Sequence, residues 1–165
     1  MADFHQTGVI TTLHRLGARD LGRVEEALVA HSDKRPIALV LPCLFSELGS
    51  VALKGIVEVL HRVPYLSQVV VSLSGAATSD HYREMNAFFS EVRCLDQRPP
   101  TILWNCGQRV ESLLGRLREE GLDPGADGKG RATWLAYGYV LAMDRARVVA
   151  VHDCDIRDYS RELLA

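Results

Sequence analysis

The sequence predicts an α/β fold of the Rossmann-like type, in which a mostly parallel, doubly wound sheet carries helices on both faces. Short apolar, β-branched runs alternate along the chain with longer segments whose apolar residues have helical spacing. Proline, glycine and aspartate residues separate these segments. The stretches between successive strands are long enough for the crossovers that parallel strands need.

The N-terminal part of the chain is predicted to flank the main domain. Residues 1–18 have only a weak apolar pattern, whereas 20–31 has the spacing of an amphipathic helix. We therefore assign residues 1–35 to a flanking arm and helix, and residues 36–165 to one α/β domain. The chain stops just after the start of another helix, so we expect the domain to be truncated and the chain to be the front half of something larger.

The sheet is predicted to begin with two parallel strands joined by a helix. The run 37–41 is apolar and is expected to stop at Pro42, which lacks a backbone donor. Apolar residues at helical spacing predict one amphipathic helix over 47–63. The run 69–71 then forms a second buried strand.

The second half of the chain repeats this alternation. The expected elements are a helix over 81–92, a strand over 101–104, helices over 108–120 and 132–142, and a buried strand over 146–151. A loop rich in glycine, 121–130, precedes the last helix. Trp134, Tyr137 and Tyr139 recur near helical spacing in that helix, so we expect them to pack internally rather than to bind a ligand.

Composition and charge exclude several classes of protein. A chain of 165 residues buries about two-thirds of its unfolded surface, so it needs neither a metal nor a disulfide to fold. The net charge of −2 gives no electrostatic footprint for nucleic acid or an anionic membrane, and no apolar stretch approaches membrane-spanning length. The predicted partners therefore include neither nucleic acid nor a membrane, while a homodimer is left open.

The cysteines point to a reducing compartment. Four are present, widely spaced and without a Cys-x-x-Cys pair, namely Cys43, Cys94, Cys106 and Cys154. Most lie in or beside apolar segments, where a reduced cysteine acts as a small hydrophobic residue. The N-terminus has no apolar leader segment. We therefore expect a cytoplasmic protein.

Two short motifs predict a site for a divalent metal and a diphosphate. Gly-Lys-Gly at 128–130 opens a helix, where glycine lets the backbone approach an anion, free amides can donate to it, and Lys129 adds a full charge. Asp153 and Asp155 follow directly on an apolar strand, and such hard oxygen ligands suit Mg²⁺ or Mn²⁺. Carboxyl ends of parallel strands are where open α/β sheets bind ligands. Each motif alone is also compatible with an ordinary solvated turn.

Other familiar motifs fail at defining positions. A P-loop would need glycine at 123 and serine or threonine at 130, where the chain has Asp123 and Gly130. An EF-hand loop starting at Asp153 would need glycine at position 158 and glutamate at 164, where Asp158 and Leu164 stand. No Gly-x-Gly-x-x-Gly follows the first strand, and no serine-hydrolase elbow is present. His152 is the histidine of interest, because it directly precedes the acidic pair.

With these residues in view, the chain resembles the nucleotide-sugar-binding half of A-type glycosyltransferases. The closest likeness is to the retaining glucosyl-3-phosphoglycerate synthase and mannosylglycerate synthase families. Four motifs carry it in family order: the first-strand segment 40–47, Ser-Gly at 74–75, Gly-Lys-Gly at 128–130 and Asp-Cys-Asp at 153–155. An aspartate that commonly reads the base after the second strand is replaced by Ser72 or Leu73, which leaves the nucleotide open.

The resemblance implies a site and a reaction. The residues implied to bind the nucleotide sugar are Pro42, Leu44, Glu47, Ser74, Lys129 and Asp153, and those implied to bind Mg²⁺ or Mn²⁺ are Asp155 and Asp153. No residue of the chain is implied to act as a nucleophile. The partners implied are a nucleoside-diphosphate sugar and a small hydroxyl or phosphorylated acceptor such as glycerate or 3-phosphoglycerate.

Two other functions remain open from the sequence. A nucleotidyltransferase that makes the activated sugar also uses a metal-binding acid on an α/β sheet, although its glycine-rich signature is expected directly after the first strand, where this chain has no glycine. A non-catalytic nucleotide-binding fragment is the second alternative. Pyrophosphate release from a nucleoside triphosphate and a sugar phosphate would identify the first of these.

Overall fold

The computed structural model describes residues 20–95 and 97–165, so the arm predicted at 1–18 lies outside the described residues. The predicted α/β fold is confirmed, because four parallel strands form one sheet in the order β3-β2-β1-β4. The strands are β1 (Ile37–Leu44), β2 (Leu66–Ser74), β3 (Thr101–Trp104) and β4 (Val148–Val151). The helices are α1 (Leu21–Ser32), α2 (Val51–Leu60), α3 (Ser79–Phe88), α4 (Gln108–Glu119) and α5 (Lys129–Met143), with short 3-10 helices η1 (Phe45–Glu47) and η2 (Arg161–Leu163).

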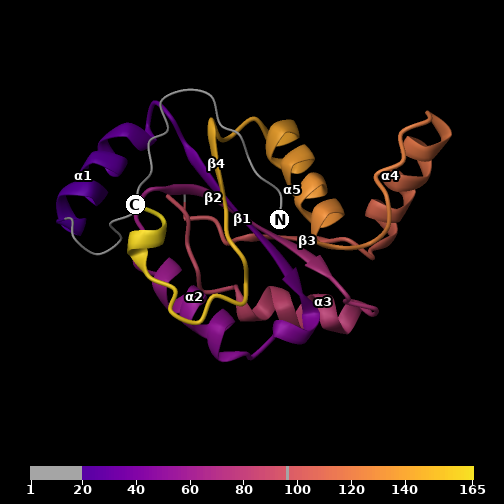
Figure 1. Ribbon diagram of the computed structural model, residues 1–165, viewed down its shortest axis with the longest axis horizontal. Coiled ribbons are helices and arrows are strands. Elements are labelled where there is room, and N and C mark those ends of the chain that lie inside the picture. Colours follow the sequence, from indigo (N-terminus) through magenta and orange to yellow (C-terminus); the bar gives the residue numbers. More distant parts are fainter. Residues whose placement is uncertain (1–19, 96) are drawn as a thin grey trace, which may run out of the picture.

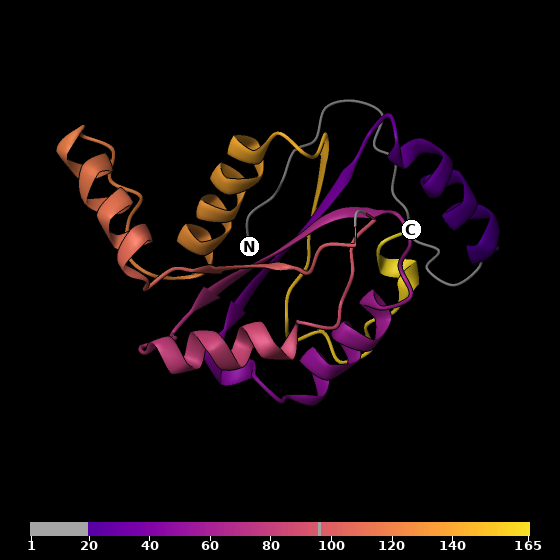
Figure 2. The same ribbon diagram turned by 180° about the vertical axis from the view of Figure 1, so that it is seen from behind.

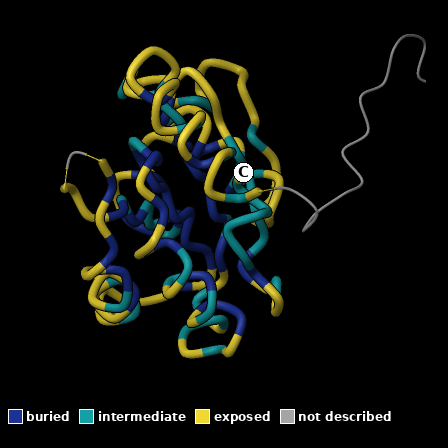
Figure 3. The backbone as a smooth tube through the Cα atoms, turned by 90° about the vertical axis from the view of Figure 1, so that its left-hand side faces the viewer, coloured by how far each residue is buried: buried dark blue, intermediate teal, exposed yellow. Residues whose placement is uncertain are grey.

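Helices cover both faces of the sheet. In Figure 1 and from behind in Figure 2, α2 and α3 lie against one face and α5 against the other. Alternate residues of β1 supply the two cores: Leu39 and Leu41 pack in the cluster that contains α2 and α3, and Val40 packs with Ala136 and Val140 of α5. Full burial of each large side chain of this kind contributes about 1.5–3 kcal/mol. Figure 3 shows the resulting buried centre under exposed outer surfaces.

Two helices lie at the periphery of the sheet. Asp20 caps α1, and its carboxylate accepts from the amide of Arg23. Leu28 of α1 packs against the larger core, so this helix joins the domain through that contact. The amphipathic helix α4 packs on α5 at the edge of the sheet, where Leu114 and Leu135 form one small cluster with Leu103 of β3 against it.

The strand order creates a switch point at the carboxyl end of β1. The chain runs from β1 to β2 to β3 in one direction, and then returns through α4 and α5 to place β4 on the opposite side of β1. In open α/β sheets such a reversal leaves a crevice beyond the strand ends, where ligands bind. The segments that follow β1 and β4 therefore meet at this crevice.

The prediction that the first strand stops at Pro42 is wrong. β1 continues to Leu44 and pairs with β2 as far as Ser74. On its other side β4 pairs only up to Val40, whose carbonyl accepts the last bond, from the amide of His152. The backbone groups of Pro42 face the same neighbouring strand as those of Val40, but β4 has already ended there. The missing N–H of Pro42 therefore costs no hydrogen bond of the sheet.

The predicted single helix over 47–63 is also wrong at its start. The chain first forms η1, and Gly49 then adopts φ +79°, a left-handed conformation that ends any continuous helix. Ser50 begins α2 by accepting the amide of Leu53 at 3.0 Å through its side chain. The result places Glu47 in a tight turn directly after β1.

The last strand differs from its prediction as a buried element. β4 lies at the edge of the sheet, and Val148 and Val149 are 44% and 39% exposed.

The internal packing predicted for the aromatic residues of α5 is wrong for Trp134 and Tyr137, which are 48% and 40% exposed. One helix face meets the sheet, and these two side chains lie off it. Tyr139 does pack against the smaller core.

Candidate nucleotide and metal site

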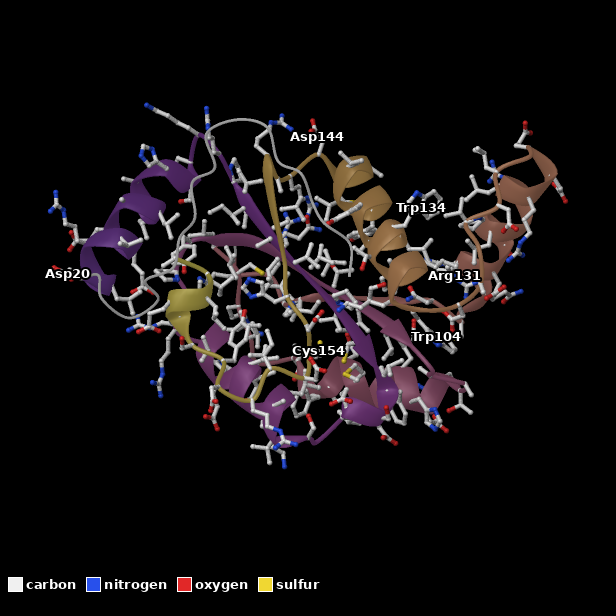
Figure 4. All side chains as sticks on the ribbon, viewed as in Figure 1. Asp20, Trp104, Arg131, Trp134, Asp144 and Cys154 are labelled. Carbon is white, nitrogen blue, oxygen red and sulfur yellow. The ribbon has the colours of Figure 1, made fainter. Side chains whose placement is uncertain are left out.

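A cavity of about 320 Å³ lies at the carboxyl end of β1, within the size range of small-ligand sites. It is formed where the ends of β1 and β2, the start of α5 and the segment after β4 come together. Figure 4 shows Cys154 at this end of the sheet, where β4 leads into the C-terminal segment. The cavity thus occupies the switch point that the strand order defines.

All the residues predicted to form the site line this one cavity. They are Pro42, Leu44, Glu47, Ser74, Lys129, Asp153 and Asp155. The four motifs lie up to more than a hundred positions apart in the chain, and the parallel topology joins them because carboxyl ends of parallel strands share one rim. The structure therefore meets the geometric condition of the predicted site, while the roles of its residues stay predictions.

The first residue of α5 contributes a cation to the cavity. The helix was predicted over 132–142, but it begins at Lys129 after Gly128, which supplies no capping side chain. The first-turn amides of α5 therefore keep the capacity to donate to an anion, and the helix dipole favours negative charge there. Arg131 turns away from the cavity, and its guanidinium lies 2.9 Å from the carboxylate of Asp127.

Lys129 forms an ion pair with the acidic motif. Its Nζ lies 2.5 Å from Oδ1 of Asp153, and both side chains remain partly exposed. The hydrogen bond to Asp153 raises the pKa of Lys129, and the nearby charge of Asp155 adds to this. Lys129 is therefore fully protonated at neutral pH, and a permanent positive charge stands beside two carboxylates.

The carboxylates of Asp153 and Asp155 are the candidate metal ligands of the cavity. Within 20–95 and 97–165, no group of three or more histidine, cysteine, aspartate or glutamate side chains is arranged to hold an ion. Asp155 is exposed, Asp153 is half-buried, and Glu47 lines the same cavity. A site of this kind offers a cation two oxygen-bearing side chains and leaves its remaining positions to other ligands.

His152 does not line the cavity, and its contacts indicate a structural role. Its Nδ1 lies 2.8 Å from the hydroxyl of Tyr159, and burial lowers the pKa of His152. The side chain is therefore neutral at neutral pH. It helps to hold the segment after β4 against the core, in which Tyr159 is buried.

Two thiols at the cavity were not expected from the sequence. Cys43 and Cys154 were assigned to the hydrophobic interior; both are buried, and both line the cavity. The hydrogen bond with Cys43 is the larger cause and burial the smaller cause of a pKa of Cys154 well above its usual range. Cys154 therefore stays a neutral thiol. Their meeting follows from the register, because each lies three positions after the paired residues Val40 and Val151.

None of the described helices is long and apolar enough to cross a membrane. This finding agrees with the hydropathy of the sequence. All four cysteines are free thiols.

Comparison with known proteins supplies two relatives. The chain is 38% identical over 165 residues to a glucosyl-3-phosphoglycerate synthase from Persephonella marina, in a match covering 100% of this chain and 40% of that protein. It is 31% identical over 164 residues to a glucosyl-3-phosphoglycerate synthase from Methanococcoides burtonii, covering 99% of this chain and 38% of that protein. No protein-family model and no solved structure matches. The chain thus spans about two-fifths of these relatives, and over that span the resemblance to glucosyl-3-phosphoglycerate synthases predicted from its motifs is confirmed.

Proposed function

We propose that this chain is the nucleotide-sugar-binding part of a metal-dependent, retaining glycosyltransferase. The reaction moves a hexose from a nucleoside-diphosphate sugar to a small acceptor such as glycerate or 3-phosphoglycerate. One observation carries the proposal: Lys129, Asp153 and Asp155 line a single cavity at the switch point of the sheet. The names of the two relatives support glucose as the sugar and 3-phosphoglycerate as the acceptor.

The acidic pair fits a divalent cation that phosphate groups help to hold. Mg²⁺ is commonly bound by one or two protein carboxylates together with the phosphates of a substrate. Asp155 is the more exposed of the two acids and is the direct ligand in this proposal, and Asp153 either joins it or binds the ribose. When bound, Mg²⁺ or Mn²⁺ supplies Lewis-acid stabilisation of the charge that grows on the leaving nucleoside diphosphate.

Lys129 and the start of α5 provide a second source of positive charge. In the ligand-free protein the ammonium pairs with Asp153. A diphosphate entering the cavity offers more negative charge than one carboxylate, so Lys129 exchanges its partner and Asp153 is released to the metal or the ribose. The first-turn amides of α5 add fixed donors without any reorganisation.

The ends of β1 and β2 supply the contacts to the nucleoside. Leu44 is 54% exposed beside the cavity and offers an apolar surface to a base, with Pro42 beside it. Glu47 and Ser74 offer oxygen atoms to hydroxyl groups of the ribose or to the base. This division leaves the phosphates near α5 and the nucleoside near β1.

A thermal-shift panel tests the proposal. UDP-glucose, GDP-glucose, ADP-glucose and GDP-mannose are each added with Mn²⁺ and again with a chelator. We expect at least one of them to raise the melting temperature with Mn²⁺ and to lose most of that effect without it, because ligand binding stabilises the folded state. If none of the four compounds changed the melting temperature under either condition, the proposal would be wrong.

A transfer assay separates binding from catalysis. Because the chain spans about two-fifths of its relatives, we expect it to transfer little or no sugar by itself. Release of pyrophosphate from a nucleoside triphosphate and a sugar phosphate would instead identify a nucleotidyltransferase. We further propose a reducing cytoplasmic setting, which the four free thiols support.

A further inference from the structure

A buried polar cluster beneath the cavity joins three elements of the fold. Ser72 and Ser74 come from the end of β2, and Asn105 directly follows β3. Ser72 and Asn105 are fully buried, and Ser74 is 4% exposed at the cavity wall. Buried polar groups of this kind are costly unless they are hydrogen-bonded, so the cluster is held together strongly.

The direction of each hydrogen bond follows from a count of protons. The hydroxyl of Ser72 has one proton and two acceptors within reach, the carbonyl of Ala132 at 2.8 Å and Oδ1 of Asn105 at 3.2 Å; the shorter contact takes the proton, so Ser72 donates to Ala132. Ser72 must then accept from Asn105, whose Nδ2 lies 3.0 Å away. The same Nδ2 donates to the hydroxyl of Ser74 at 3.0 Å. Both amide hydrogens of Asn105 are thereby used.

This arrangement leaves the proton of Ser74 available. Its oxygen accepts from Asn105, and among the described residues Ser74 donates no side-chain hydrogen bond. Ser74 lines the cavity, so its hydroxyl lies at the wall of the space that a ligand would enter. Resting on the proposed function, we infer that Asn105 is a positioning residue that fixes the Ser74 hydroxyl as a proton donor to an acceptor oxygen of the bound nucleotide.

The backbone around Asn105 prevents the amide from moving away. The amide nitrogen of its main chain donates to the carbonyl of Leu73 at 2.9 Å, which extends the pairing of β3 with β2 by one residue. The preceding Trp104 donates from Nε1 to the carbonyl of Ala76 at 2.7 Å and stacks on Tyr82. The side chain of Asn105 is therefore presented from a rigid support, as positioning of another group requires.

The same cluster sets the relative positions of the two halves of the cavity. Through Ser72 it reaches the carbonyl of Ala132, in the first turn of α5. Lys129 begins that turn, so the cluster links the hydroxyl of Ser74 to the cation across the site. Loss of Asn105 is expected to disturb Ser74 first, because that contact is direct.

A double-mutant cycle tests the inference by calorimetry with Mn²⁺ and UDP, GDP or ADP, whichever binds wild type. The variants are Ser74→Ala, Asn105→Ala and the combination, with Asn86→Ala on the exposed side of α3 as the control. Ser74→Ala is expected to weaken binding about tenfold, the worth of one good hydrogen bond. Asn105→Ala should weaken wild type by about threefold to tenfold but have little effect in the Ser74→Ala background. Asn86→Ala should have none.

The possible results separate the inference from the function on which it rests. Equal losses from Asn105→Ala in both backgrounds, or no loss in a folded variant, would overturn the inference alone. Failure of all three nucleotides to bind wild type would contradict the proposed function, and the inference with it. Wild type provides a second measurement that is independent of variant folding: the side-chain amide resonances of Asn105 should shift at saturating nucleotide. Unchanged resonances would also overturn the inference.

Discussion

The ammonium of Lys129 lies 2.5 Å from Oδ1 of Asp153, so a cation and a candidate metal ligand are paired with each other before any ligand arrives. The pair joins the start of α5 to the segment after β4 across the cavity. In the proposed function, binding of a metal and a diphosphate breaks this contact. Nucleotide binding and Mn²⁺ binding should consequently respond differently to the removal of Lys129.

Lys129→Ala is expected to weaken nucleotide binding in the presence of Mn²⁺ by about tenfold or more, because one charge-assisted hydrogen bond is lost. Binding of Mn²⁺ alone should be unchanged or tighter, because the carboxylate of Asp153 is released. The melting temperature should hardly move, since an exposed ion pair contributes little to stability. Calorimetry with Mn²⁺ alone and then with nucleotide checks both signs. Lys54→Ala, at an exposed position of α2, is the control. Weaker Mn²⁺ binding in Lys129→Ala would contradict the proposed exchange of Asp153 for the diphosphate as the partner of Lys129.

Asp155→Asn is expected to reduce the metal-dependent part of nucleotide binding by more than about tenfold, because even indirect partners of a metal site commonly matter to that extent. The substitution keeps size and shape and removes only the charge. Titration of Mn²⁺ in the presence of a saturating nucleotide provides the measurement. Asp158→Asn is the matched control, because Asp158 is exposed in the same segment and does not line the cavity. Equal behaviour of the two variants would remove Asp155 from the metal site.

Gly107→Ala is expected to destabilise the protein by about 1–3 kcal/mol, the usual cost of overpacking. A Cβ at Gly107 would lie 2.9 Å from the ring of Trp104, which its hydrogen bond to Ala76 prevents from moving. A Cβ at Gly115, inside the helix that Gly107 precedes, meets nothing within 4 Å, so Gly115→Ala should stabilise the protein by about 0.5–1 kcal/mol. Urea unfolding of both variants gives the comparison, and changes of the same sign would contradict the packing argument.

Two buried tyrosines should respond differently to loss of their hydroxyls. The hydroxyl of Tyr65 is buried without a hydrogen-bond partner among the described residues, so Tyr65→Phe is expected to be neutral or stabilising by up to about 1 kcal/mol. Tyr159 has a partner in His152 at 2.8 Å, so Tyr159→Phe should destabilise by about 1 kcal/mol. Chemical denaturation measures both effects. A large loss of stability in Tyr65→Phe would show that its hydroxyl has a partner.

Stability is expected to fall at alkaline pH through Tyr65. Burial, reinforced by the charge of Glu25, raises the pKa of Tyr65 to about 12 from its ordinary value of 10.0. Above pH ~10 the unfolded chain loses this proton while the folded chain keeps it, so the free energy of unfolding decreases by up to about 1.4 kcal/mol per pH unit until pH ~12. Denaturation between these pH values, with tyrosinate absorbance, follows the effect. Tyr65→Phe should make the dependence shallower without abolishing it, because burial also raises the pKa of Tyr159, and an unchanged slope would refute this assignment.

Local patterns predicted several elements well. β3 matches its prediction at 101–104, because two prolines precede it and a turn follows. Helix α4 likewise follows from its spacing of apolar residues. The convergence of Lys129 with Asp153 and Asp155 was also predictable, since strand ends in a parallel sheet share one rim and the order of the motifs was visible in the chain.

Features that depend on strand order and register could not be predicted in this way. The length of β1 past Pro42 depends on where β4 stops, and the exposure of Val148 depends on β4 lying at an edge. The contact between Cys43 and Cys154 and the placement of Asn105 beside Ser74 depend on pairings between residues distant in sequence. Periodicity within one segment carries no information about such partners.

Pro42 has a consequence for the acidic segment beside it. The amide of His152 already donates to Val40, so continued parallel pairing would next require an N–H at position 42 to donate to the carbonyl of His152. An imino acid has no hydrogen to give. The next hydrogen bond between β1 and β4 therefore cannot form, and the chain leaves strand geometry at His152. A missing hydrogen in one strand thereby allows Asp153 and Asp155 of its neighbour to face the cavity.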